Sequence, residues 1–210
     1  MCSVLNLTRE ILPKISRIPQ KNIDAVNSLP EMILGRMIRE GDKSIVHCDM
    51  NHSVGAIISP NGINTIYTDA LAGCNSVNII TKLKDNKFVS ILSHYVPTNI
   101  EGQINAIRKQ IQTYLPHIDM NYQPKAFLNI RGRQTYEGLE PVPNPIVDKL
   151  KELLDKFFPQ GSKMDITPYQ NSNRPAFFSS ANIFQFDPAD ISKLKITNVG
   201  EKEKFIDLNI

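Results

Sequence analysis

The sequence contains no tryptophan and only three cysteines in 210 residues, and its formal net charge is only +3. Cys2, Cys48 and Cys74 are too few and too widely spaced for a disulfide framework, so we expect a reducing compartment. Nucleic-acid-binding proteins usually carry runs of basic residues interleaved with aromatics. In this chain the basic residues are spread along the sequence and form no such run. We therefore expect no nucleic acid among the partners.

Long apolar runs are missing as well. No stretch approaches the roughly 20 apolar residues that cross a bilayer. The N-terminus also lacks a charged segment followed by an apolar stretch of the secretory type. We therefore expect no membrane span, and either a cytoplasmic location or delivery by a secretion route that needs no signal peptide.

The composition predicts one folded domain preceded by an extension. With 41% hydrophobic residues, the chain can bury one sizeable core. The first 30 residues carry three prolines and show weak periodicity. A short helix follows, with Pro30 in its first turn and Gly41 at its end. We expect residues 1–42 to form this extension with its helix, packed on a single domain of residues 43–210.

Helical spacing and strand-like alternation occur in separate stretches, which predicts an α+β fold. One helix is expected after Thr98-Asn99-Ile100-Glu101, which has the pattern of a capping box, and it should end at Pro116. A second should run from Asn144-Pro145 to Pro159. Strands are expected near residues 44–48, 54–59, 63–68, 77–83, 88–96, 125–127, 163–167, 176–178, 183–186 and 194–197.

We expect a hairpin that joins the strands on either side of the polar segment Lys84-Asp85-Asn86-Lys87. A two-residue turn at Asp85-Asn86 would place Val77 opposite His94. In that register Cys74 falls on the face opposite to His94. A bulge, or a turn at Gly73, would then be required to bring the two side chains together.

Cys74 and His94 are the two residue types that thiol chemistry requires. A cysteine sulfur attacks a carbonyl carbon as the thiolate, and a nearby imidazole can take its proton. Gly73 allows a turn that frees backbone N–H groups, and those of Cys74 and Asn75 are candidates to hold an oxyanion. Without His94 and Gly73, a packed structural role would be the simpler interpretation of Cys74.

The segment from Thr68 to Cys74, Thr-Asp-Ala-Leu-Ala-Gly-Cys, is followed by His94 on the next strand. It resembles the glutamine deamidases of the cytotoxic necrotizing factor and chemotaxis-receptor deamidase superfamily, and it is similar to the Burkholderia lethal factor at the same motif. The resemblance covers roughly residues 43 to 187. It implies that Cys74 is the nucleophile and His94 the base, and that Thr68, six residues before the cysteine, orients the imidazole.

The resemblance implies a deamidase-type fold, with mixed or antiparallel sheets arranged like a β-sandwich and flanked by helices. It also implies a hydrolase that deamidates a glutamine side chain of a protein substrate through a thioester, with no cofactor and no metal. Transglutamination or proteolysis would use the same pair of residues. The enzyme would act in its own cell, as the chemotaxis deamidases do, or inside a host cell, as the toxins do.

Two alternatives remain open at this point. One is a non-enzymatic protein-interaction module on the same fold, in which Cys74 is a packing residue. The other is a zinc-dependent enzyme that resembles the laccase-domain purine nucleoside enzymes, because His47, Cys48, Asp49 and His52 offer the ligand types that zinc prefers. Alternation along a strand, however, would point His47 and Cys48 to opposite faces.

Overall fold

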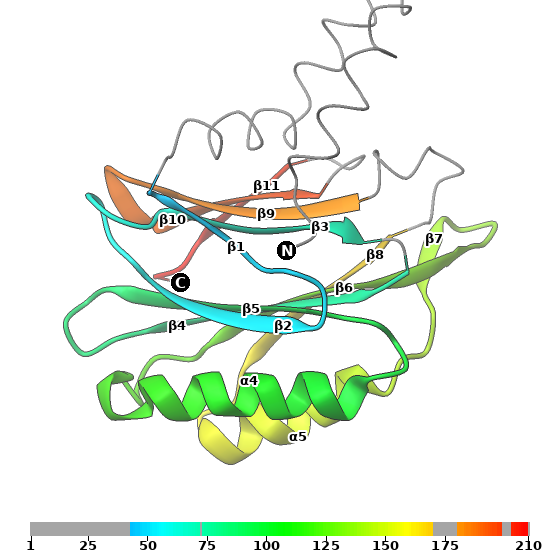
Figure 1. Cartoon of the computed structure of the whole chain (residues 1–210), viewed down its shortest axis with the longest axis horizontal. Coiled ribbons are helices and arrows are strands. Elements are labelled where there is room, and N and C mark those ends of the chain that lie inside the picture. The colour runs from blue at the N-terminus through cyan, green and yellow to red at the C-terminus, as the bar shows by residue number, and fades with distance from the viewer. Residues whose placement is uncertain (1–42, 72, 170–179, 199–202, 210) are drawn as a thin grey trace, which may run out of the picture. The chain divides into compact units, whose positions relative to one another are not determined.

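The described part of the chain has three layers, in which one β-sheet covers a second sheet and two α-helices cover the other face of that second sheet (Figure 1). The structure is a computed structural model of the chain, and it describes residues 43–71, 73–169, 180–198 and 203–209. It contains both helices and mixed sheets, so the α+β class expected from the sequence is confirmed.

The described strands form two sheets. The first sheet consists, in order across it, of β1 (Ile45–His47), β3 (Thr65–Leu71), β9 (Ser180–Asp187), β10 (Asp190–Asn198) and β11 (Lys204–Asp207). The second consists of β2 (His52–Ile58), β5 (Phe88–Tyr95), β4 (Asn75–Lys82), β6 (Lys125–Gln134) and β7 (Leu139–Pro141), with β8 (Lys163–Tyr169) also paired to β6. Pairs β1–β3 and β6–β8 are parallel, and the other pairs are antiparallel.

Two of these strands, β7 and β11, were not expected from the sequence. They have three and four residues, too few to show a convincing alternation of apolar and polar side chains. The strand expected at 176–178 lies outside the described residues. So do residues 1–42, and the extension with its short helix therefore stays a prediction.

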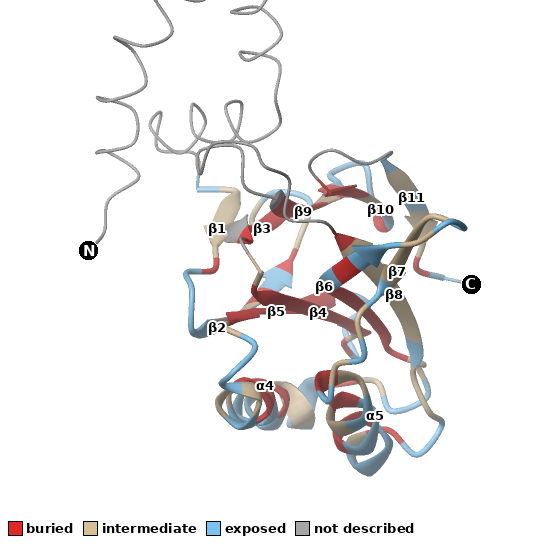
Figure 2. Ribbon diagram, turned by 90° about the vertical axis from the view of Figure 1, so that its right-hand side faces the viewer, coloured by how far each residue is buried: buried red, intermediate tan, exposed pale blue. Residues whose placement is uncertain are grey.

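The central strands β4 and β5 are buried on both faces, between the first sheet and the helices (Figure 2). One core lies between the sheets and includes Ile66, Ile80, Phe88, Leu92 and Phe184. The other lies beneath the helices and includes Val77, Ile79, Val89, Ile91, Ile107 and Leu150. Burial of each large apolar side chain contributes roughly 1.5–3 kcal/mol. These two cores hold the ends of β4 and β5 in a defined place.

The helices are α4 (Ile100–Tyr114), which continues into a 3₁₀ turn (Leu115–His117), and α5 (Ile146–Phe157). The expected capping box at Thr98 is wrong by one residue. Asn99 is the N-cap, and its side-chain oxygen accepts a hydrogen bond from the Gly102 amide at 3.2 Å. None of the helices in the described ranges is long and apolar enough to cross a membrane.

The register of the β4–β5 hairpin also differs from the expected one. The Leu83 amide donates to the Lys87 carbonyl at 2.8 Å, so the loop contains three residues rather than two. Its last residue, Asn86, has a φ of 64°, a left-handed conformation that asparagine tolerates better than most residues. Ser76, and not Val77, therefore lies opposite His94. A one-residue shift of this kind moves a strand's side chains to the other face.

Candidate functional site

The predicted site lies between the two sheets, at one end of β3, β4 and β5. Thr68 belongs to β3 of the first sheet, His94 is the next-to-last residue of β5, and Cys74 directly precedes β4. Because Ser76 pairs with His94, alternation places position 74 on the same side of the second sheet as His94. The bulge required by the expected register is not needed.

Thr68 and His94 are joined by a hydrogen bond across the two sheets. Thr68 Oγ1 lies 2.8 Å from His94 Nδ1, and the same hydroxyl donates to the carbonyl of Cys48 at 2.8 Å. A threonine hydroxyl has one proton, which here goes to Cys48. His94 Nδ1 must therefore carry the proton of the other bond, and a neutral His94 keeps its lone pair on Nε2.

The environment of His94 favours this neutral form. Burial lowers the pKa of His94 from 6.5 to about 4, although the negative charge of Asp69 acts in the opposite direction. The side chain is 1% exposed, and its Nε2 has no hydrogen-bond partner in the part of the chain that the structure describes. An unpaired buried nitrogen is costly to maintain, and such groups occur at catalytic positions.

Cys74 is also buried and uncharged at neutral pH. It is 7% exposed and packs against Leu71, Val96 and Tyr169. Burial raises the pKa of its thiol. Among the described residues, the thiol makes no hydrogen bond to His94. The free protein thus holds a neutral thiol and a neutral imidazole. Catalytic hydrogen bonds that are absent in a free enzyme often form only when substrate is bound.

The backbone turn before β4 offers one amide for an oxyanion. Asn75 already lies within the β4–β5 ladder, opposite Tyr95. The amide of Cys74 precedes the strand, and among the described residues it has no hydrogen-bond partner. Gly73, with a φ of +106°, adopts a backbone conformation that essentially only glycine tolerates. Of the two expected donors, the Cys74 amide is therefore the more available.

Tyr169 is the residue at this site that the sequence analysis missed. Its hydroxyl accepts a hydrogen bond from the Gly73 amide at 2.9 Å and donates to the Cys74 carbonyl at 2.5 Å. It lies at the end of β8, almost 100 residues after the cysteine, in a strand with no pattern that indicates a functional site. Only the tertiary structure brings it to the turn.

A charged cluster borders the site at β1 and the end of β3. His47 Nε2 lies 3.2 Å from Asp69 Oδ1, His47 Nδ1 lies 3.4 Å from Asp49 Oδ1, and the imidazole stacks on Tyr67. Burial opposes protonation of His47, but the hydrogen bond and charge of Asp69, with the charge of Asp49, outweigh it and raise the pKa of His47. Burial opposes ionisation of Asp69, but the hydrogen bond and charge of His47, with a smaller contribution from His94, outweigh it and lower the pKa of Asp69.

The residues considered for zinc do not converge on one point. Cys48 lies in the core between the sheets, where its Sγ is 3.4 Å from the carbonyl oxygens of His52 and Leu92, the possible acceptors of its one thiol proton. Burial raises the pKa of Cys48 to about 12. Within the described ranges, no group of three or more histidine, cysteine or acidic side chains is placed to hold a metal ion. The zinc alternative thus gains no support from the geometry.

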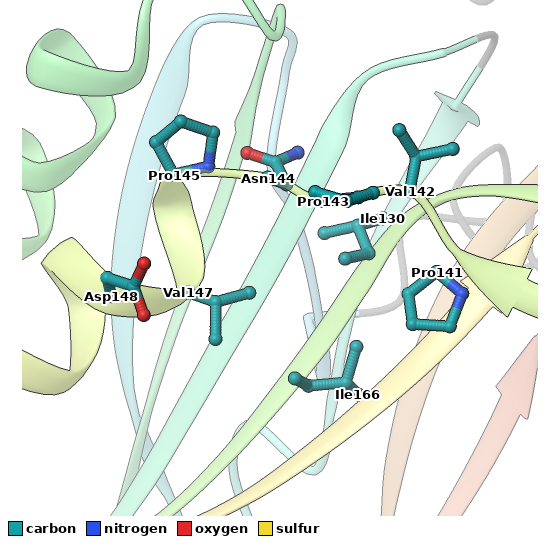
Figure 3. Close-up of a pocket in the computed structure, with 9 residues that line it drawn as sticks. All are labelled: Ile130, Pro141, Val142, Pro143, Asn144, Pro145, Val147, Asp148 and Ile166. Carbon is teal, nitrogen blue, oxygen red and sulfur yellow. The ribbon is translucent and has the colours of Figure 1, made fainter.

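A surface groove of about 480 Å³ lies on the other side of the second sheet (Figure 3). It is lined by Ile130, Ile166, the segment 141–145 and the start of α5. Asn144 on its rim donates to the side-chain oxygen of Asn75 at 2.8 Å. A residue that lines the groove is thus bonded to the residue after the cysteine, but the groove lies on the helix side of the sheet, whereas His94 faces the first sheet.

Comparison with known proteins gives little support to a family assignment. No family model and no curated protein matches the chain. Among solved structures, the C-terminal domain of CNFy from Yersinia pseudotuberculosis is similar with a TM-score of 0.35 and 6% sequence identity. The alignment covers 78% of this chain but only 61% of that one. At this score the likeness establishes neither a common fold nor a common function.

Proposed function

We propose that this protein is a cysteine-dependent deamidase that hydrolyses the side-chain amide of a glutamine in a protein substrate. The observation that carries the proposal is the hydrogen bond from His94 Nδ1 to Thr68. It leaves the lone pair on Nε2, buried and unpaired, on the side of the sheet where Cys74 directly precedes β4. This is the tautomer that a general base for a thiol requires.

The reaction begins with a transfer of the Cys74 thiol proton to His94 Nε2. The thiolate attacks the amide carbon of the glutamine, and the oxygen of the tetrahedral intermediate is stabilised by the backbone N–H of Cys74, with Asn75 as the second candidate. His94 then gives its proton to the amide nitrogen, which leaves as ammonia. A thioester between Cys74 and the glutamyl group remains.

Water completes the cycle. His94 Nε2 takes a proton from a water molecule while the water oxygen attacks the thioester carbon. The bond between this carbon and the Cys74 sulfur then breaks, and the sulfur takes the proton back from His94 to form the thiol again. The product is a glutamate side chain in place of the glutamine. The net reaction consumes one water, releases one ammonia and requires no cofactor.

The choice of a glutamine amide rests on the sequence rather than on the geometry. A cysteine, a histidine and a threonine in this arrangement serve several acyl-transfer reactions. The segment from Thr68 to Cys74, followed by His94, resembles the glutamine deamidases in particular. The deamidase-type fold and a protein as the substrate are part of the same proposal.

The proposal is tested on protein extracts treated with the full chain. Mass spectrometry should find glutamines converted to glutamates, and the Cys74→Ala protein should convert none. Cys48→Ala is the matched control, because it removes the thiol of a second buried cysteine and keeps the Cys48 carbonyl that accepts from Thr68, so this variant should stay active if it folds. Glutamine conversion that persists in Cys74→Ala would overturn the assignment. New amine cross-links or new chain ends that depend on Cys74, without glutamate formation, would replace it by transglutamination or proteolysis.

One observation favours a second candidate, the non-enzymatic interaction module. Cys74 is 7% exposed, its pKa is raised and its thiol makes no hydrogen bond to His94, which is how a packed cysteine behaves. The two candidates differ in acylation by p-nitrophenyl acetate. An enzyme should release p-nitrophenol in a burst that is lost in Cys74→Ala, whereas a packed cysteine should show no such burst.

A further inference from the structure

The turn that carries Cys74 is held by a side chain from a distant strand. Tyr169 Oη accepts the Gly73 N–H at 2.9 Å, and its own proton goes to the carbonyl oxygen of Cys74 at 2.5 Å. The phenol is 5% exposed and packs directly on Leu71 and Cys74. One hydroxyl thus binds the backbone on both sides of the Cα atom of the cysteine, at the amide of the preceding residue and at the carbonyl of the cysteine itself.

These two bonds determine which backbone groups of the turn remain available. The Gly73 amide and the Cys74 carbonyl are both occupied by Tyr169. A trans peptide points its N–H and its C=O in opposite directions. The held Cys74 carbonyl therefore directs the Asn75 amide away from Tyr169, in keeping with the place of Asn75 in the ladder opposite Tyr95. The Cys74 amide lies between the two held groups and has no hydrogen-bond partner among the described residues, so it is the amide left to donate to an oxyanion.

Gly73 has a φ of +106°, which glycine adopts without steric cost. Glycine is also the most flexible residue, so contacts such as the two hydrogen bonds of Tyr169 are needed to keep the turn in one conformation. Burial keeps the phenol of Tyr169 protonated by raising its pKa, so the hydroxyl serves as donor and acceptor throughout the physiological pH range. Tyr169 itself is held by β8, which pairs with β6 from Lys125 to Arg131.

We propose that Tyr169 is a positioning residue of the deamidase, which orients the Cys74 amide toward the oxyanion of the reaction and takes no part in the proton transfer between the thiol and the imidazole. The inference rests on the proposed function. It assigns to Tyr169 a role that differs from simple packing, because its loss should affect the step that forms an oxyanion and spare a step that does not.

Two reagents separate these steps. p-Nitrophenyl acetate acylates a cysteine through a tetrahedral oxyanion: the sulfur bonds to the acetyl carbon, p-nitrophenolate leaves and the thiol proton goes to the base. Iodoacetamide alkylates the sulfur by displacement of iodide, and no oxyanion forms. In Tyr169→Phe, which keeps the buried ring, we expect acylation of Cys74 to fall roughly tenfold to a hundredfold. Alkylation of Cys74 should stay within about twofold of the parent rate, because the oxyanion-binding amide takes no part in it.

The matched control is Tyr122→Phe. The hydroxyl of Tyr122 also donates to a backbone carbonyl, that of Leu208 at 2.7 Å, but it lies outside the site. This variant should leave both rates unchanged, and Cys74→Ala gives the background from the other cysteines. Equal acylation in Tyr169→Phe and the parent, or an equal fall in both reactions, would overturn the role of Tyr169 while the proposed function stands. A parent protein without Cys74-dependent acylation would instead overturn the proposed function.

A measurement on the unmodified protein covers the case in which Tyr169→Phe does not fold. The Gly73 amide, because it donates to Tyr169, should exchange its hydrogen for deuterium slowly. The amide of Tyr136, a fully exposed residue in the loop of the β6–β7 hairpin with no hydrogen-bond partner for this amide among the described residues, gives the reference for fast exchange. Exchange of the Gly73 amide as fast as that of Tyr136 would contradict the hydrogen bond from Gly73 to Tyr169 directly.

Discussion

Thr68 and His94 lie on different sheets, 26 residues apart in the chain, and the threonine oxygen is 2.8 Å from the imidazole Nδ1. The direction of this bond follows from a third residue, because the threonine proton is given to the Cys48 carbonyl. A main-chain oxygen therefore determines which nitrogen of His94 is free to accept a proton. The hydrogen bond between Thr68 and His94 is the feature from which the proposed chemistry follows.

Replacement of Thr68 by valine should remove this control. Without the oxygen, His94 Nδ1 loses its acceptor and the imidazole is free to take the other tautomer or to rotate. We expect Cys74-dependent acylation by p-nitrophenyl acetate to fall roughly tenfold to a hundredfold, a part of what a general base contributes. Thr81→Val is the matched control, because Thr81 is equally buried and its hydroxyl has no partner among the described residues. That change should leave acylation intact, and an equal loss in both variants would contradict the role of Thr68.

The stability of the protein should depend on pH through His94. Its pKa is about 4 in the folded protein and near 6.5 when unfolded, so the unfolded chain takes up a proton first as the pH falls. The contribution of neutral His94 is complete above pH 6.5 and is lost progressively between pH 6.5 and 4. The total is on the order of 3 kcal/mol.

Urea unfolding measured across this range tests the prediction. In His94→Gln, the loss of stability between pH 6.5 and 4 should be smaller than in the parent protein. Thr81→Val is the control, because it changes a buried side chain without removing a titratable group and should leave the pH dependence unchanged. Parallel curves for the parent and His94→Gln would show that burial does not shift the pKa of His94.

Gly73→Ala and Gly138→Ala form a matched pair. Both glycines have a strongly positive φ, of +106° and +131°, so an alanine should cost roughly 1–3 kcal/mol of stability at either position. A Cβ at Gly138 meets no atom within 4 Å, so its effect is backbone strain alone. Only Gly73→Ala should also slow acylation of Cys74. Normal acylation in a folded Gly73→Ala protein would show that the turn conformation is not needed for the chemistry.

The pH dependence of Cys74 alkylation reports the state of the free thiol. Burial raises the thiol pKa and lowers that of His94, so both groups are neutral near pH 7. The rate with iodoacetamide, measured against Cys74→Ala, should be lower at pH 7 than for a small thiol and should keep rising above pH 9. A fast rate that is constant down to pH 6 would indicate a preformed thiolate and imidazolium pair instead.

The sequence identified the elements better than their exact geometry. Alternation and helical spacing located β4, β5, α4 and α5, because these elements are long enough to show a period. The short strands β7 and β11 were missed for the opposite reason. The hairpin register was predicted one residue off, because a three-residue loop closed by Asn86 and a two-residue turn use the same polar residues.

The sequence by itself determined the α+β class and the candidate residues Thr68, Cys74 and His94, since residue types and short spacings are local properties. The tertiary structure alone decided that Cys74 and His94 share one side of the sheet, which depends on the register. It also brought Thr68 to His94 from another sheet and Tyr169 to the cysteine turn. Contacts between distant segments arise from the packing of whole sheets, and no local pattern in a single sequence records them.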